Sequence, residues 1–305
     1  MQKQLLPVGF YDLLFDEAEK NHKNINKAVD SFLSAGYRLI KMPLVEFADS
    51  FLTKNSQNCF HSLDIISGKN LIFRNDITPQ ISRLLASRLA EEKLPLKLCY
   101  VGDVLRAKNN DLYADRQQTQ VGVEIIGCDK EKSNFKVVKI LLATLKKLQV
   151  EKLLIEFSLP NFLEIFLAEI DEGKNENLRD AIKQKNISLI KNLAGKNSEI
   201  ITKIALLNHD LKNLSVEILA KIKSEKIAAE IFRAQKIAEF LQENFPEVEV
   251  CFDLFGDDKS SYHRDIAFDV FCGDFSYPIA RGGRYKVDQF DAIGATIYMN
   301  FLRKI

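Results

Sequence analysis

The chain carries two hydrophobic periodicities, and the second interrupts the first. Before residue 160 and after residue 246, short segments alternate apolar and polar residues, which is the spacing of strands. Between these points glycine becomes scarce, and Leu, Ile, Lys, Glu and Asn recur at helical spacing. We therefore predict an α+β fold: a mixed, mostly antiparallel sheet flanked by helices, formed by residues 1–159 and 247–305, with a helical insertion of residues 160–246.

Individual elements follow from the same patterns. Outside the insertion, the expected helices are residues 16–34, 80–92 and 132–148. The expected strands are residues 38–46, 70–74, 96–106, 118–126, 152–158, 248–255, 262–271, 277–280 and 294–299. Pro43 lies within the first strand and indicates an edge or interface position, because proline cannot donate to a strand ladder.

Composition excludes several classes of protein. Lys and Arg total 43 and Asp and Glu total 42 among 305 residues, so the net charge is +1 and lacks the basic excess of a dedicated nucleic-acid binder. No apolar run approaches the roughly 18 residues of a membrane span, and the N-terminus has no secretory pattern. We expect a cytoplasmic protein without a membrane partner.

Cysteine and histidine spacing gives no sign of a metal site. The five cysteines form no C-x-x-C pair, which favours buried reduced thiols over disulfides or zinc ligands. The four histidines form no H-E-x-x-H motif. No P-loop, G-x-G-x-x-G or G-x-S-x-G motif is present, so we expect neither a metal nor a cofactor.

The strand at residues 118–126 supplies the first candidate site. Gln120 and Glu124 lie on one of its faces, where a carboxylate and an amide oxygen suit an ammonium group. Arg106 lies on the preceding strand, and its guanidinium suits a carboxylate or a phosphate. The pattern indicates a site for a zwitterion such as an α-amino acid. A solvated sheet face with cross-strand pairs is the alternative.

Three further segments carry candidate residues. Gly282 and Gly283 form a tight turn beside Tyr285, which could close a pocket over a polar ring; an ordinary hairpin turn is the alternative. Asp76 and Thr78 could bind an ammonium, and simple helix capping explains them equally well. His263 is a further candidate ligand-binding residue, and a purely structural role is the alternative.

Taken together and in order, these segments resemble the catalytic core of class II aminoacyl-tRNA synthetases, specifically the histidyl enzymes and their paralogues. The start Leu6-Pro-Val-Gly-Phe-Tyr-Asp12 resembles L-P-x-G-x-x-D, and residues 36–46 resemble the first class motif, the usual dimer interface. Residues 71–80 resemble the L-R-x-[DE]-x-T segment, and residues 100–127 resemble the second motif. Residues 280–285 resemble one histidine-recognition signature, and residues 262–269 loosely resemble the other.

Departures from the synthetase pattern narrow the expected function. Lys108 stands where the second motif carries an ATP-binding glutamate, and Phe301 stands where the third motif, G-x-x-x-G-x-E-R, carries an arginine. Tyr298 replaces a glycine of that motif, and Asp258 replaces an expected catalytic arginine. Losing cations that neutralise a triphosphate removes the main electrostatic contribution to adenylation. The chain ends at Ile305, soon after this motif, so no anticodon-binding domain is expected.

This combination resembles the regulatory subunits of ATP phosphoribosyltransferase, which act in the first step of histidine biosynthesis. The resemblance implies a non-catalytic subunit that activates a short catalytic subunit and conveys feedback inhibition by free histidine. It implies homodimers within a hetero-octamer, and tRNA is not an expected partner. A histidyl-tRNA synthetase-like enzyme and a free-standing histidine sensor remain open. The residues that the resemblance assigns to histidine are Asp76, Thr78, Arg106, Gln120, Glu124, Tyr262, His263 and Tyr285, with Gly282 and Gly283 shaping the pocket.

Overall fold

The computed structural model describes residues 6–50, 58–108, 115–128, 130–173, 175–207, 211–256, 263, 265–273, 275–287 and 289–303. The chain divides into two compact units, residues 1–150 with 287–305 and residues 151–286. Both units combine helices with strands, and parallel and antiparallel pairings occur in each. The predicted boundaries at residues 160 and 246 stay a prediction, because the second unit also takes in four strands.

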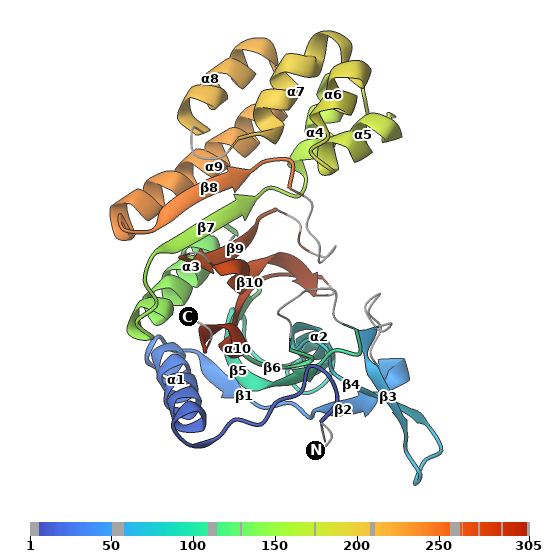
Figure 1. Ribbon diagram of the computed structural model, residues 1–305, viewed down its shortest axis with the longest axis vertical. Helices are drawn as coiled ribbons and strands as arrows, with labels where there is room; N and C mark the ends of the chain where they lie inside the picture. The colour runs from blue at the N-terminus through green and yellow to red at the C-terminus, as the bar shows by residue number, and fades with distance from the viewer. Residues whose placement is uncertain are drawn as a thin grey trace, which may run out of the picture. The chain divides into compact units, whose positions relative to one another are not determined.

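The first unit is built on four strands in the order β1-β5-β6-β11 (Figure 1). These strands are β1 (Arg38–Ile40), β5 (Leu96–Leu105), β6 (Gln117–Ile126) and β11 (Phe290–Tyr298). β1 runs parallel to β5, and the other two pairings are antiparallel. A small antiparallel sheet has the order β2-β4-β3, with β2 (Val45–Phe47), β3 (Phe60–Leu63) and β4 (Asn70–Phe73).

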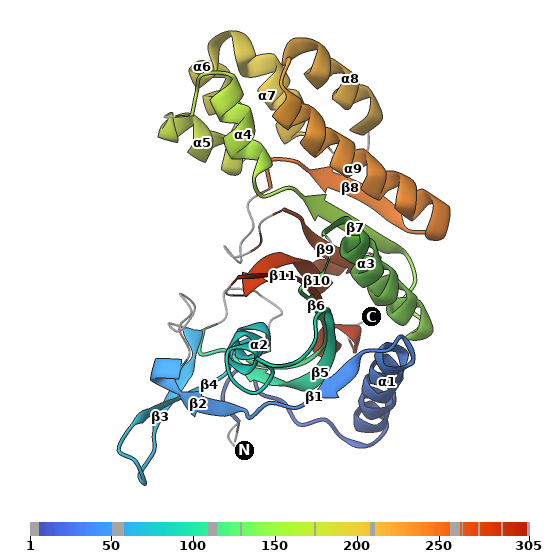
Figure 2. The ribbon, with the colours of Figure 1, turned by 180° about the vertical axis from the view of Figure 1, so that it is seen from behind.

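Helices cover the two faces of β5 and β6 differently. The helices of this unit are α1 (Phe15–Ser34), α2 (Thr78–Leu85), α3 (Lys130–Lys147) and α10 (Met299–Leu302). α1 and α3 pack against each other and against β6, whose Val121, Val123 and Ile125 are buried. Figures 1 and 2 show α2 against the curved β5 and β6. The start of α2 is bonded to the other face of β6, which carries Gln120 and Glu124.

The second unit contains the predicted helical block. Its helices are α4 (Phe162–Glu169), α5 (Glu176–Lys183), α6 (Ile187–Leu193), α7 (Ser198–Ala205), α8 (Leu211–Lys221) and α9 (Glu225–Asn244). Its strands, in the order β10-β9-β7-β8, are β7 (Leu153–Ser158), β8 (Glu249–Asp253), β9 (Ala267–Cys272) and β10 (Phe275–Val287). β7 is parallel to β8 and antiparallel to β9. Aromatic rings fill the core, with the Phe157 ring centroid 5.8 Å from that of Phe252 and 5.7 Å from that of Phe268.

Several predicted elements differ from the structure. The expected strand 38–46 is two strands in different sheets, because the chain leaves β1 before Pro43, which cannot donate to a ladder. The expected helix 80–92 begins two residues earlier and ends at Leu85, after which the chain makes turns. The glycine pair at residues 282 and 283 was predicted to form a turn and instead lies inside β10, paired with Phe268 and Ala267 of β9.

Three further findings concern the cysteines, the helices and possible metal ligands. All five cysteines are free, and Cys59, Cys99, Cys251 and Cys272 are buried. Among the helices of the described residues, none has the length and apolar character that a membrane span requires. No group of three or more His, Cys, Asp or Glu side chains in the described part of the chain could hold a metal ion.

Candidate functional site

The first unit brings four of the predicted site residues into one hydrogen-bonded cluster. Gln120 Nε2 donates to Asp76 Oδ1 at 2.9 Å, and Thr78 Oγ1 donates to Glu124 Oε1 at 3.2 Å. Gln120 Oε1 accepts from the backbone N–H of Ile77 at 3.2 Å. Two segments distant in sequence, the start of α2 and the middle of β6, therefore form one polar surface.

The local sequence places Asp76 and Thr78 at the start of α2. Pro79 sits in the first turn of α2, where its missing N–H costs nothing. The N-cap residue of α2 is Ile77, whose side chain makes no cap bond. The side chains of Asp76 and Thr78 both bond to β6, to Gln120 and Glu124 respectively. Arg74 holds the loop before them, with Nη1 3.1 Å from Gln80 Oε1 and Nε 2.7 Å from the carbonyl of Asp103.

Burial raises the free energy of charged groups in this cluster. Glu124 is 1% exposed, Gln120 is fully buried and Thr78 is 8% exposed. Burial, followed by the charges of Glu124 and Asp76, raises the pKa of the Tyr100 hydroxyl well above its usual value. Burial also raises the pKa of the Tyr37 hydroxyl, and the charge of Glu124 is the next cause. The two carboxylates therefore create a negative potential, which suits a cationic group of a ligand.

Sequence reasoning missed the residues that complete this surface from the neighbouring strands. Tyr100 on β5 and Thr296 on β11 share a hydrogen bond of 2.8 Å across Gly122 of β6. Gly294 on β11 faces Glu124, so closely that a Cβ would overlap the carboxylate, with Oε1 2.7 Å away. Only the register of three strands brings these residues together, and no local pattern reveals that register.

Arg106 lies at the end of the same face. Its guanidinium carbon is 6.0 Å from the ring centroid of Tyr298, which pairs with Gln120 in the register of β11 and β6. Within the described residues the guanidinium makes no hydrogen bond or ion pair, so its donors are available to an anion. Arg116 takes a different place: its guanidinium packs 4.7 Å from the Phe60 ring and 5.3 Å from the Phe10 ring.

The segment after β11 is held by apolar packing and by hydrogen bonds of the Asn300 side chain. Phe301 is 6% exposed and its ring lies 5.9 Å from that of Tyr298, edge to face. Asn300 Oδ1 accepts from the Thr119 N–H at 2.8 Å, and Asn300 Nδ2 donates to Asp115 Oδ2 at 2.8 Å. Aromatic rings therefore occupy positions 298 and 301, and the phenyl ring offers no donor to a phosphate.

The remaining predicted residues belong to the second unit or fall outside the described residues. His263 packs against Gly283, where a Cβ would lie 2.5 Å from His263 Cδ2, so only glycine fits. Tyr285 is buried in β10, and Arg281 forms an ion pair with Asp269 at 3.3 Å. Tyr262 and Asp258 lie outside the described residues. The assignment of Tyr262, His263 and Tyr285 to histidine stays a prediction.

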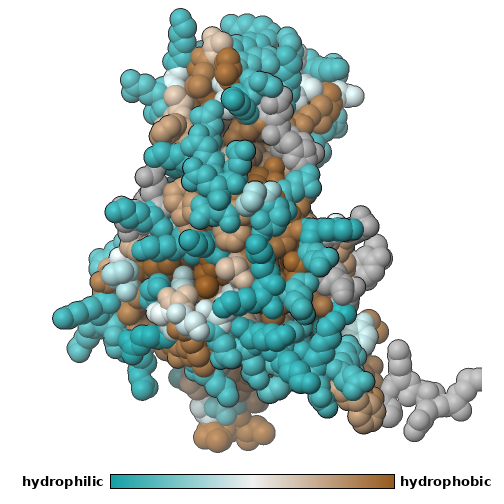
Figure 3. Space-filling view, turned by 90° about the vertical axis from the view of Figure 1, so that its left-hand side faces the viewer, coloured by the Kyte–Doolittle hydropathy of each residue, from teal (hydrophilic) through white to brown (hydrophobic). Residues whose placement is uncertain are grey.

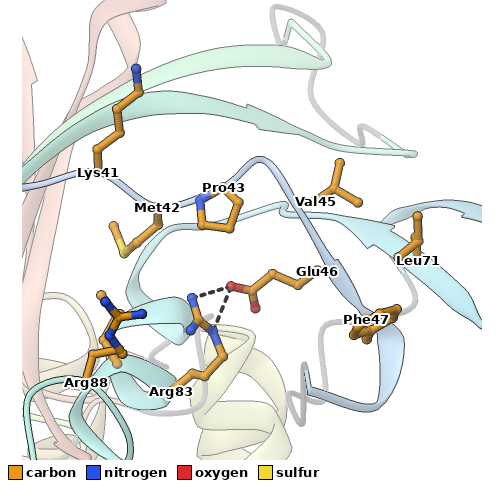
Figure 4. A pocket seen from close by; sticks show the side chains of 10 residues that line it. Lys41, Met42, Pro43, Val45, Glu46, Phe47, Leu71, Arg83 and Arg88 are labelled. Carbon is orange, nitrogen blue, oxygen red and sulfur yellow. Dashed lines mark hydrogen bonds and ion pairs between the residues drawn. The ribbon is translucent and has the colours of Figure 1, made fainter. Parts of the chain in front are cut away.

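A groove of about 620 Å³ lies beside α2 (Figure 4). Its apolar wall is formed by Met42, Pro43, Val45, Phe47, Leu71 and Leu84. Arg83 crosses it to Glu46, with Nη2 2.7 Å from Oε1, and Gln80 Nε2 donates to the same oxygen at 2.9 Å. Lys41 and Arg88 also line the groove, and neither has an ion-pair partner within the described residues.

The comparison with protein families agrees with this fold. The histidyl-tRNA synthetase family matches residues 9–302, so the chain belongs to that family. Within the family it belongs with the ATP phosphoribosyltransferase regulatory subunits. The one from Burkholderia cenocepacia is 30% identical over 294 residues, which cover 93% of this chain and 76% of that protein.

Solved structures show the same fold. An ATP phosphoribosyltransferase regulatory subunit/histidyl-tRNA synthetase from Bacillus halodurans superposes with a TM-score of 0.83 at 21% identity, covering all of this chain and 84% of that one. A chain of the ATP phosphoribosyl transferase (HisG:HisZ) complex from Thermotoga maritima gives 0.72 at 21% identity, covering 92% and 97%. The predicted class II synthetase-like fold is confirmed.

Proposed function

We propose that this chain is a non-catalytic regulatory subunit of ATP phosphoribosyltransferase that binds free histidine, activates a short catalytic subunit and conveys feedback inhibition. Asp76, Thr78, Gln120 and Glu124 hold the ammonium group, and Arg106 faces the carboxylate. Tyr262, His263 and Tyr285 contact the imidazole, with Gly282 and Gly283 shaping the pocket. The assignment to the imidazole rests on the family resemblance alone.

One observation carries the proposal: groups suited to an amino acid persist where groups suited to a triphosphate are gone. The carboxylates of Asp76 and Glu124 and the open guanidinium of Arg106 are complementary to the two charges of a zwitterion. Phe301 is buried against Tyr298 and has no charge to offer. Binding without activation of the amino acid is what a sensor subunit requires.

Regulation adds a thermodynamic condition to binding. Histidine shifts the activity of a complex only if its affinities differ between the active and inactive states. A coupling of about 1–3 kcal/mol, or roughly 5- to 150-fold in affinity, is typical of such systems. The active complex must therefore bind histidine more weakly than the inhibited one by a factor of this size.

The test measures transferase activity of the short catalytic subunit from the same organism, with and without this chain, across a histidine titration. We expect the chain to raise activity and to make it histidine-sensitive. Glu124→Gln should weaken inhibition, since it removes a negative charge from the ammonium site. Glu243→Gln, on the exposed surface of α9, is the matched control.

The outcomes separate the alternatives. Histidine binding without any complex or effect on the transferase would favour a free-standing histidine sensor. Formation of histidyl adenylate from ATP and histidine by the chain alone would favour a synthetase-like enzyme. Absence of histidine binding by the wild-type chain would refute the proposal.

We also propose a homodimer of this chain, within a hetero-octamer with the catalytic subunit, formed through residues 36–47 and the β3–β4 hairpin. Support comes from exposed apolar side chains: Phe47 is 40% exposed, Leu63 58%, Ile65 92% and Ile66 97%. Figure 3 shows a largely hydrophilic face that also carries hydrophobic residues at its lower edge. Grouped apolar residues of this kind mark interaction sites.

Light scattering coupled to gel filtration tests the dimer. The double change Ile65→Asp and Ile66→Asp should yield monomers at concentrations where the wild type is dimeric, because two charges cannot be desolvated in an apolar contact. Val216→Asp on α8, where Val216 is 68% exposed, is the control and should stay dimeric. A dimeric hairpin variant would refute this interface.

A further inference from the structure

Gln118 on β6 is a buried amide without hydrogen-bond partners. The residue is 1% exposed, and neither its Nε2 nor its Oε1 bonds to any described residue. Its neighbours on the strand differ in this respect, since Gln120 binds Asp76 and Glu124 binds Thr78. Leaving an amide buried and unpaired is unfavourable, so such groups in native proteins call for a specific explanation.

The register of the sheet puts Gln118 beside the proposed amino-acid site. Gln118, Gln120 and Glu124 share one face of β6, since alternate residues of a strand point the same way. Gln118 lies one pleat from Gln120, which is a separation of about 6.5–7 Å along the strand. On the adjacent β5 it pairs with Val104, so that Arg106 follows as its diagonal neighbour on the same face.

The hydrogen-bonding groups of Gln118 and Arg106 are complementary. The Arg106 guanidinium packs over the Tyr298 ring and makes no hydrogen bond within the described residues. It has five donors and no acceptor, whereas the amide of Gln118 has two donors and one acceptor group. A carboxylate between them would accept from both, and the amide oxygen would accept from the remaining guanidinium N–H groups.

We propose that Gln118 is a specificity-determining residue that binds the carboxylate of a free α-amino acid together with Arg106. This assignment rests on the proposed function of the site. An α-amino acid carries its ammonium and carboxylate on one carbon, so a ligand whose ammonium lies at Asp76 and Gln120 places its carboxylate within one pleat of β6. Gln118 Nε2 donates to one carboxylate oxygen, and Arg106 donates to the other.

The consequence is selection for amino acids over the corresponding amines and alcohols. Histidinol has a hydroxymethyl group in place of the carboxylate and keeps the ammonium and imidazole groups. It gains little from Gln118, because a neutral hydroxyl forms weaker hydrogen bonds than a carboxylate. A residue that merely supports the fold would affect both ligands alike.

The test is calorimetric titration of the full chain with histidine and with histidinol. Gln118→Leu should weaken histidine binding at least tenfold and change histidinol binding less than threefold. Gln118→Met, which is closer in shape, should behave in the same way. Gln117→Leu is the matched control, because Gln117 is the exposed neighbour on the opposite face of the strand and should change neither affinity.

Thermal unfolding without ligand supplies a second readout. Gln118→Leu should unfold at the same temperature as the wild type or higher, since an unpaired buried amide has been removed. Unchanged histidine affinity in Gln118→Leu, or equal losses for both ligands, would overturn the assignment while leaving histidine binding by the chain intact. A wild-type chain that binds no histidine would instead refute the proposed function, and this assignment with it.

Discussion

Gly294 is the position where the smallest change should have the largest effect on the site. It pairs with Glu124 across β11 and β6, and the carboxylate occupies the space of a Cβ at this position. Gly294→Ala therefore forces the Glu124 side chain away, because the methyl group is anchored to the backbone of β11, which is paired with β6. The hydrogen bond of 3.2 Å from Thr78 to Glu124 would be lost with that movement.

The magnitude follows from what the displaced carboxylate would bind. A hydrogen bond to a charged group contributes about 1.5–3 kcal/mol. If the Glu124 carboxylate contacts the ligand ammonium, its displacement should lower histidine affinity by roughly 10- to 150-fold. Overpacking adds a cost of about 1–3 kcal/mol in stability, which corresponds to a fall in Tm of roughly 2–12 °C.

Calorimetry with histidine, together with thermal unfolding and circular dichroism, measures both effects. Gly173→Ala is the matched control, since the nearest atom to its Cβ would be Ala168 Cα at an ordinary 3.6 Å. A folded Gly294→Ala chain that binds histidine as tightly as the wild type would refute the role of Glu124. A variant that fails to fold would be replaced by Thr78→Val, which removes the same hydrogen bond without adding bulk.

Three further predictions concern stability and reactivity. Tyr100→Phe should lower Tm by roughly 2–8 °C in thermal unfolding, because it removes a buried 2.8 Å hydrogen bond to Thr296; an unchanged Tm would contradict that bond. At pH 8 a thiol reagent should label Cys128 first and all five cysteines only in denaturant, since burial raises the pKa of Cys99 to about 11 and that of Cys251 to about 12. Burial raises the pKa of Glu230, although the nearby charge of Arg233 acts in the opposite direction. The folded state therefore binds the proton of Glu230 more tightly than the unfolded state does. The stability that this proton contributes is lost as the pH rises through the pKa of the folded state. Glu230→Gln should therefore raise Tm at pH 7 relative to the wild type and make little difference at pH 4; a lower Tm at pH 7 would show that the ion pair dominates.

The polar face of β6 could be predicted because its pattern is local and unambiguous. Alternation over ten residues fixes which side chains share a face, and the structure confirms that Gln120 and Glu124 are buried together. The bonds of these residues to Asp76 and Thr78 could not be derived from spacing, since Thr-Pro before a helix is equally the pattern of a cap. The bonds to β6 are tertiary contacts, which the local sequence does not encode.

The glycine pair in β10 illustrates the opposite case. Two adjacent glycines between cations are typical of a turn, so the sequence favoured one. In the structure Gly283 has an extended backbone and is required because His263 lies where a side chain would be. A glycine needed for its missing Cβ and a glycine needed for its backbone freedom look identical in sequence. Gln118 was missed for a related reason, because a polar residue in an alternating strand carries no sign that its partner is absent.

Helix α2 is the element that contacts both the polar cluster and the groove. Its first residue, Thr78, binds Glu124, and Gln80 and Arg83 in its next turn bind Glu46 at the groove. Arg74, which donates to Gln80 and to the carbonyl of Met42, ties the preceding loop to the same groove. A ligand that moves the start of α2 must therefore carry Gln80 and Arg83 with it or break their partly buried bonds to Glu46. Because the groove adjoins the surface proposed for the dimer, histidine binding and subunit contact would be linked through one short helix, which is the physical continuity that a coupling between two sites requires.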